Sequence, residues 1–121
     1  MNGKRKWAIA ALAVLTVTLA VAETPLHAGR TADAADGQVA VRIFAYSPAA
    51  VTVTRGATVT WTNGDEITHT VTSGAPGKKD ARFDGRLEGK GAAFRHTFTE
   101  PGIYTYFCDR HQAMTGQILV K

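Results

Sequence analysis

From Gln38 onward, hydrophobic and polar residues alternate with a period of two, which is typical of strands with one buried face. The alternation is clearest over residues 39–43 and 58–62. It is interrupted by turn-forming residues at Ser47-Pro48 and at residues 63–65 (Asn-Gly-Asp). No segment of this region shows helical periodicity over ten or more residues. Further strands are predicted over residues 51–54, 67–72, 92–99, 102–108 and 115–120.

Seven or eight short strands with frequent turn signals favour an all-β fold, a two-sheet Greek-key β-sandwich. Residues 73–91 contain five glycines and many charges, so this stretch is expected to be mostly loop, with a short irregular strand near Phe83. The hydrophobic strand positions form the expected core, namely Val39, Val41, Ile43, Val51, Val53, Val59, Trp61, Val71, Phe94, Phe98, Ile103, Tyr106, Ile118 and Val120.

The N-terminal segment follows a different pattern. A basic stretch at residues 4–6 (Lys-Arg-Lys) precedes a mostly apolar run over residues 7–22, which ends in the small-x-small sequence Ala-Val-Ala. This order is typical of a secretory signal peptide, and the run is shorter than the roughly 20 residues that cross a bilayer. We therefore expect residues 1–22 to be a cleaved signal peptide, 23–37 a flexible lead-in and 38–121 a single periplasmic domain.

The net charge of the expected mature protein argues against nucleic-acid binding. Cleavage removes three of the 14 basic residues and none of the 10 acidic ones, so the net charge falls from +4 to +1. The basic character of the chain therefore belongs largely to the export segment and gives no reason to expect nucleic-acid binding. After cleavage, we expect a monomer without a membrane span.

Three sulfur and nitrogen side chains follow one another just before the last predicted strand. Cys108, His111 and Met114 have C-x-x-H-x-x-M spacing, and Cys108 is the only cysteine of the chain. An exported protein with one cysteine cannot form an internal disulfide, so metal binding explains its presence. A His₂Cys set with a weak axial Met is the ligand set of blue-copper electron-transfer sites. His69, on a different predicted strand, supplies the second imidazole.

Other interpretations fit these residues less well. Structural zinc takes Cys, His or carboxylate ligands, for which a thioether is a poor substitute. The haem motif C-x-x-C-H is absent, and a Cys–His hydrolase leaves Met114 without a role. His96 competes with His69 as a ligand, but it shares strand parity with two phenylalanines and is expected to be a partly buried structural residue. His27 is expected to be solvated, and chance placement of the four residues is the remaining alternative to a metal site.

These motifs resemble the cupredoxin family, in its plastocyanin, pseudoazurin and amicyanin branch. Residues 56–65, which lead to His69, are similar to the segment that carries the first histidine ligand. Residues 97–108 are similar to the strand pair that leads to the cysteine. The two-residue gap between His111 and Met114 matches amicyanin and pseudoazurin. With no helical extension after Lys121, we expect an amicyanin-like domain.

The resemblance implies one mononuclear type 1 copper ion held by His69, Cys108, His111 and Met114, with His111 as the electron-transfer edge. It implies an electron carrier and not an enzyme. The expected partners are redox proteins, a donor such as a dehydrogenase and an acceptor such as a cytochrome. The main alternative is a periplasmic copper-handling protein, although such proteins usually display several Met or His residues at an open site.

Two positions depart from the family pattern. Asn often follows the first histidine and braces the cysteine loop, whereas this chain has Thr70, whose hydroxyl is expected to brace the loop less fully. Proline is common beside the second histidine, whereas Arg110 and Gln112 flank His111 here. The absence of proline removes some preset backbone geometry from the loop, and Asp109 and Arg110 place charge near a face that is usually apolar.

Overall fold

The computed structural model describes residues 35–121, so the expected signal peptide and almost all of the lead-in lie outside the described residues. Within residues 35–121 the chain is all-β, and no helix there is long and apolar enough to cross a membrane. Nine strands are present, where seven or eight were expected. They are β1 (Gly37–Arg42), β2 (Ala45–Ser47), β3 (Ala50–Val53), β4 (Thr58–Asn63), β5 (His69–Ala75), β6 (Lys78–Leu87), β7 (Ala93–Thr97), β8 (Gly102–Cys108) and β9 (His111–Val120).

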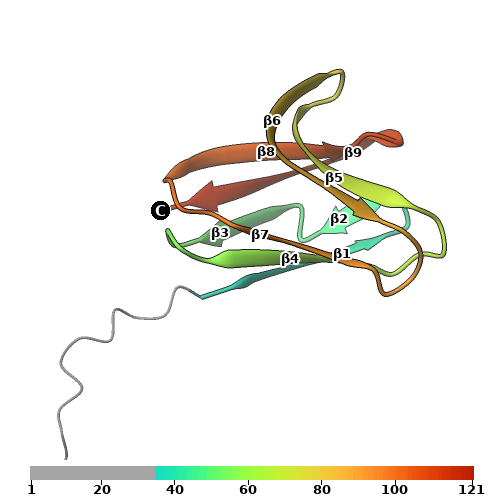
Figure 1. The fold of residues 1–121 in the computed structure, drawn as a ribbon, viewed down its shortest axis with the longest axis horizontal. Helices are drawn as coiled ribbons and strands as arrows, with labels where there is room; N and C mark the ends of the chain where they lie inside the picture. The colour runs from blue at the N-terminus through green and yellow to red at the C-terminus, as the bar shows by residue number, and fades with distance from the viewer. Residues whose placement is uncertain (1–34) are drawn as a thin grey trace, which may run out of the picture.

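The strands form two sheets packed face to face, which Figure 1 shows as two layers. One sheet has the order β2-β1-β4-β7 and the other β3-β9-β8-β5-β6. Two pairs, β1 with β4 and β3 with β9, are parallel, and the remaining pairs are antiparallel. The predicted fold class, a two-sheet Greek-key β-sandwich, is confirmed.

The core between the sheets is centred on Trp61, which is fully buried. Its ring stacks on Phe94 at a centroid distance of 5.7 Å and meets Tyr106 edge-on at 5.4 Å, and both are favourable aromatic geometries. Burial raises the pKa of Tyr106 to about 12. Most predicted core residues are buried, and Val51 and Phe94 are partly buried against the cluster.

The core prediction is wrong for two residues, Ile43 and Ile103. Ile43 is 71% exposed because β1 ends at Arg42 and the chain turns there towards β2. Ile103 is 63% exposed because it lies one residue out of step with Tyr104 and Tyr106 on β8. Successive side chains of a strand point to opposite faces, so Ile103 points away from the core.

The prediction that residues 73–91 are mostly loop is also wrong. Strand β5 continues to Ala75, and β6 pairs with it along much of its ten-residue length. The inward-facing positions of β6 are Phe83, Gly85 and Leu87, all buried. Because a glycine occupies the middle position, the period-two signal was hidden in the sequence. In Figure 1 the connected ends of β5 and β6 rise above the sandwich as an arm.

Candidate metal centre

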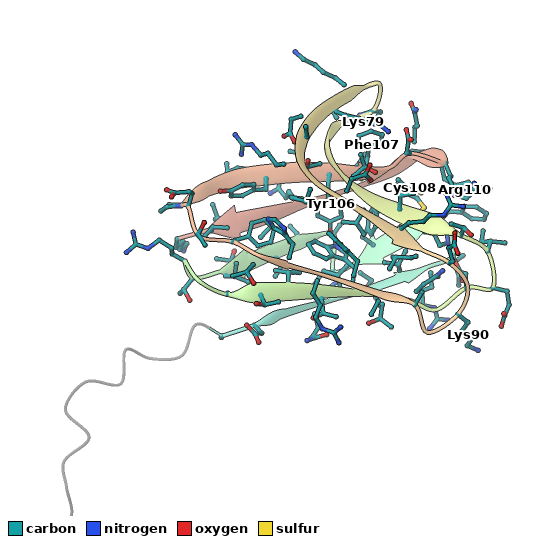
Figure 2. All side chains as sticks on the ribbon, viewed as in Figure 1. Lys79, Lys90, Tyr106, Phe107, Cys108 and Arg110 are labelled. Atoms are coloured by element: carbon teal, nitrogen blue, oxygen red, sulfur yellow. The ribbon has the colours of Figure 1, made fainter. Side chains whose placement is uncertain are left out.

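Three potential metal ligands converge at one end of the sandwich. His69 is the first residue of β5, Cys108 is the last of β8 and His111 is the first of β9. Figure 2 shows Cys108 and Arg110 at this end, where β8 passes into β9. One nitrogen or sulfur atom from each of the three residues lies within 4.8 Å of the others. The structure therefore brings together two imidazoles and a thiol that are separated in sequence.

The connection between Cys108 and His111 is a tight hairpin. Cys108 pairs directly with His111, and only Asp109 and Arg110 lie between them. The expectation that the last strand begins at residue 115 is therefore wrong, because pairing with β8 extends β9 back to His111. Met114, also on β9, is buried in the same core cluster as Cys108.

The spacing of the three ligand atoms suits a single metal ion. Cys108 Sγ lies 4.0 Å from Nδ1 of His69 and 3.7 Å from Nδ1 of His111. Metal bonds of about 2.0 Å to nitrogen and about 2.3 Å to sulfur, as found for zinc, allow such atoms to be up to about 4.3 Å apart. The set comprises a thiolate, two imidazoles and the buried thioether of Met114, which lies on the same strand as His111. These donors match the preferences of copper better than those of zinc.

Asp65 sets the orientation of the His69 ring. His69 Nε2 lies 2.8 Å from Asp65 Oδ2. If Nε2–H donates this hydrogen bond, Nδ1 is left with a free lone pair towards Cys108. The hydrogen bond from His69 holds the pKa of Asp65 below its usual value. Asp65 Oδ2 also accepts a 2.8 Å hydrogen bond from the Ile43 amide, which ties the β1–β2 turn to the site.

Thr70 connects the His69 strand to the cysteine hairpin. Its amide faces Cys108 Sγ at 3.4 Å, and its Oγ1 accepts a 2.8 Å hydrogen bond from the Asp109 amide. The Tyr46 hydroxyl donates to the Thr70 carbonyl at 2.5 Å. The hydroxyl of Thr70 therefore braces the cysteine hairpin through one hydrogen bond.

An aromatic side chain lies against both imidazoles. The ring of Phe44 is edge-on to His111 at 4.9 Å and to His69 at 6.1 Å. Ile43 and Phe44 both have positive φ, 51° and 55°, which is uncommon for non-glycine residues and costs about 1–3 kcal/mol each. The Asp65 hydrogen bond and the ring contacts offset this strain and keep Phe44 in place.

Sequence reasoning missed Asp65, Phe44 and Tyr46 as parts of the site. The position of Asp65, four residues before His69, is a usable signal, although the local Asn-Gly-Asp pattern indicates only a turn. Phe44 and Tyr46 are brought to the site by the β1–β2 hairpin, which no local pattern predicted. His96 lies apart from the three ligands, half-buried between the rings of Phe83 and Phe98, as expected. His27 lies outside the described residues.

The fold and the site together define a copper-binding β-sandwich. The model of the family "copper binding proteins, plastocyanin/azurin family" matches residues 34–121. Amicyanin-alpha of Methylorubrum extorquens is 32% identical over 114 residues, covering 93% of this chain and 94% of the relative. Amicyanin of Paracoccus denitrificans is 36% identical over 101 residues, covering 82% and 75%.

Solved structures agree with these sequence matches. A purple cupredoxin from Nitrosopumilus maritimus superposes with a TM-score of 0.64 and 32% identity, covering 71% of this chain and all of the other. The Cu(I) form of an amicyanin variant gives a TM-score of 0.63 and 32% identity, covering 71% and 82%. The chain belongs to the plastocyanin/azurin family of copper-binding proteins, with amicyanins among its relatives. Its cofactor is copper, and it is of the electron-carrier class rather than an enzyme.

Proposed function

We propose that this protein is a periplasmic type 1 (blue) copper protein that shuttles single electrons between redox partners. His69, Cys108, His111 and Met114 are the proposed ligands. The observation that carries the proposal is the meeting of two imidazoles and the single thiol within 4.8 Å, with one imidazole at the surface. Bound copper supplies a one-electron couple, Cu(II)/Cu(I).

The protein contributes a rigid and mostly dry set of donor atoms. His69 and Cys108 are fully buried, and each lies at the end of a strand paired on both sides within the sheet. Asp65 holds the His69 ring, and Thr70 holds the Cys108 hairpin. Donor atoms held in this way change little in position between oxidation states, which favours fast electron transfer.

Electrons would enter and leave at the His111 edge, because His111 is the only one of the three convergent ligands that is partly exposed. Exposed apolar side chains gather at this end, including Phe44 (57% exposed), beside His111, and Ile43. An exposed apolar patch of this kind is typical of a protein interaction site.

The charges around this patch indicate the chemistry of the partner. Arg42, Lys90 and Arg110 make no ion pair within the described residues and outnumber the one neighbouring acid that is likewise unpaired, Glu66, whereas Asp109 is paired with Lys79 at 2.9 Å. Figure 2 shows Lys90 and Arg110 at the same end of the molecule as Cys108. Unpaired cations around an apolar surface favour partners with an acidic rim, and we propose a dehydrogenase as donor and a cytochrome as acceptor.

The periplasmic location rests on the N-terminal sequence. We propose that residues 1–22 are a cleaved signal peptide, that 23–37 are a lead-in and that 38–121 are the copper-binding domain. The basic residues 4–6, the apolar run over residues 7–22 and the small-x-small sequence at its end support export. Intact-mass measurement of the protein recovered from the periplasm would test the cleavage, and a mass that retains residues 1–22 would contradict it.

Repeated redox cycling distinguishes an electron carrier from a copper-handling protein. The copper-loaded protein would be reduced and reoxidised several times in the presence of a competing Cu(I) chelator. An electron carrier retains its copper and gives a reversible one-electron voltammogram. Loss of copper to the chelator on the first reduction would contradict the proposal and favour copper handling.

A further inference from the structure

A continuous chain of hydrogen bonds leads from the cysteine hairpin into the outer strand of the sheet. The Asp109 amide donates to Thr70 Oγ1 at 2.8 Å, and Thr70 Oγ1 lies 2.9 Å from Thr72 Oγ1. Thr72 Oγ1 donates to Asp84 Oδ1 at 2.8 Å. The two threonines are buried on β5, and Asp84 is directly opposite Thr72 on β6. The chain therefore connects the residue after Cys108 to a carboxylate on a neighbouring strand.

The two end groups of this series of hydrogen bonds determine the direction in which each hydroxyl donates. A backbone amide can only donate, and an ionised carboxylate can only accept. Each threonine hydroxyl has one proton, so the proton of Thr72 must point to Asp84 and that of Thr70 to Thr72. The lone pairs of Thr70 Oγ1 are then left for the Asp109 amide. Successive hydrogen bonds of this kind also polarise and strengthen one another.

We propose that Asp84 and Thr72 are positioning residues for the copper centre, because they orient the Thr70 hydroxyl as the acceptor that holds the peptide following Cys108. Asp84 makes no hydrogen bond to a proposed ligand, and its buried connection to the hairpin runs through the two hydroxyls. The proposal rests on the proposed function, in that the oriented peptide belongs to the cysteine ligand. It goes beyond that function because it gives strand β6 a role in orienting the peptide next to the proposed cysteine ligand.

A second tie between the arm and the hairpin is weaker. Lys79 Nζ lies 2.9 Å from Asp109 Oδ2, but both side chains are about half exposed. Exposed ion pairs contribute little because water and salt screen them. Figure 2 shows Lys79 on the arm above Phe107 and Cys108. The buried hydroxyl chain, rather than this ion pair, is therefore the main restraint on the Asp109 peptide.

Hydrogen exchange of the Asp109 amide tests the proposal without copper. In the metal-free protein, Thr72→Val should speed this exchange by up to about fivefold, the factor for complete loss of one ordinary hydrogen bond, because the Thr70 hydroxyl is no longer oriented as an acceptor. Thr72→Ser, which keeps the hydroxyl, should restore slow exchange. Thr60→Val, another buried threonine on a strand, is the matched control. Equal exchange in Thr72→Val and Thr60→Val, or failure of Thr72→Ser to restore it, would overturn the proposal.

A variant at an exposed position keeps the proposal testable if Thr72→Val, at a buried position, does not fold. Asp84→Val removes the terminal acceptor from an exposed position of β6, and Asp80→Val removes the same charge from the same strand. Asp84→Val alone should speed Asp109 exchange and, in the copper-loaded protein, shift the copper–thiolate absorption band. Identical exchange and spectra for the two variants would overturn the proposal. A colourless wild-type protein would instead refute the proposed function, while the exchange measurement would still decide the role of Asp84.

Discussion

A histidine can bind a metal through either ring nitrogen, and in this protein Asp65 decides which nitrogen His69 presents. The carboxylate engages Nε2 and leaves Nδ1 facing Cys108 Sγ. The same carboxylate binds the Ile43 amide, so one side chain connects a buried ligand to the turn that carries Phe44. Single residues around the ligands therefore determine how the ligands themselves are placed.

Replacement of Asp65 should weaken copper binding without unfolding the protein. Partners that hydrogen-bond to a ligating histidine typically contribute about 10–100-fold to metal affinity, so we expect a loss in this range for Asp65→Ala. Competition with a chelator of known affinity provides the measurement. Glu66→Ala, at an exposed neighbouring position, is the control, and an equal loss in both variants would exclude a specific role for Asp65.

Met114→Leu should leave the protein folded and blue but raise its reduction potential. The axial bond in blue-copper sites is long and weak, and the axial ligand tunes the potential. Loss of the thioether favours Cu(I). Voltammetry of this variant should be compared with Ile118→Leu, a similar change at a buried position of the same strand. A colourless Met114→Leu protein, or a lowered potential, would show that Met114 is not the axial ligand.

Among the elements, strands with regular alternation were predictable from the sequence, whereas β6 and the β1–β2 turn were not. Val39, Val41 and Trp61 follow the period-two pattern, and the proposed ligands Cys108, His111 and Met114 are close together in the chain. The sequence predicted only a short strand near Phe83, because pairing with β5, and not local composition, extends β6 over ten residues. The contacts of Asp65 and Phe44 depend on the tertiary packing of distant turns, which local patterns do not encode.

Gly85 allows strand β6 to pack closely against the opposite sheet. A methyl group at this position would overlap the ring of Phe94, a residue of β7 in the opposite sheet. Gly85→Ala should therefore lower the free energy of unfolding by about 1–3 kcal/mol, as overpacking typically does. Urea denaturation would measure the change. Gly64→Ala, where the added methyl makes only ordinary contacts, is the control, and equal stability of the two variants would refute the packing argument.

At the scale of the whole molecule, the three histidines of residues 35–121 lie in two different environments. His69 and His111 lie at the ligand end, whereas His96 lies between the rings of Phe83 and Phe98 in the core margin. Burial lowers the pKa of His96 below its usual value of 6.5, because desolvation disfavours the charged ring. The unfolded chain therefore takes up the His96 proton more readily than the folded protein does.

Acid should consequently destabilise the fold through His96. Its contribution to stability is fully present above about pH 6.5 and is lost as the pH falls from there through the lower folded-state pKa. Urea midpoints of the metal-free protein at pH 7.5 and pH 5 should differ less in His96→Phe than in the wild type. Parallel losses in both proteins would assign the acid sensitivity to other groups.

The visible absorption spectrum of the copper-loaded protein tests the central claim most directly. The account predicts an intense blue band from the Cu(II)–thiolate bond, which disappears on reduction, returns on reoxidation and is absent in Cys108→Ser at equal copper loading. A wild-type protein that binds Cu(II) without this colour, or a Cys108→Ser variant that keeps it, would contradict the assignment of a blue copper electron carrier.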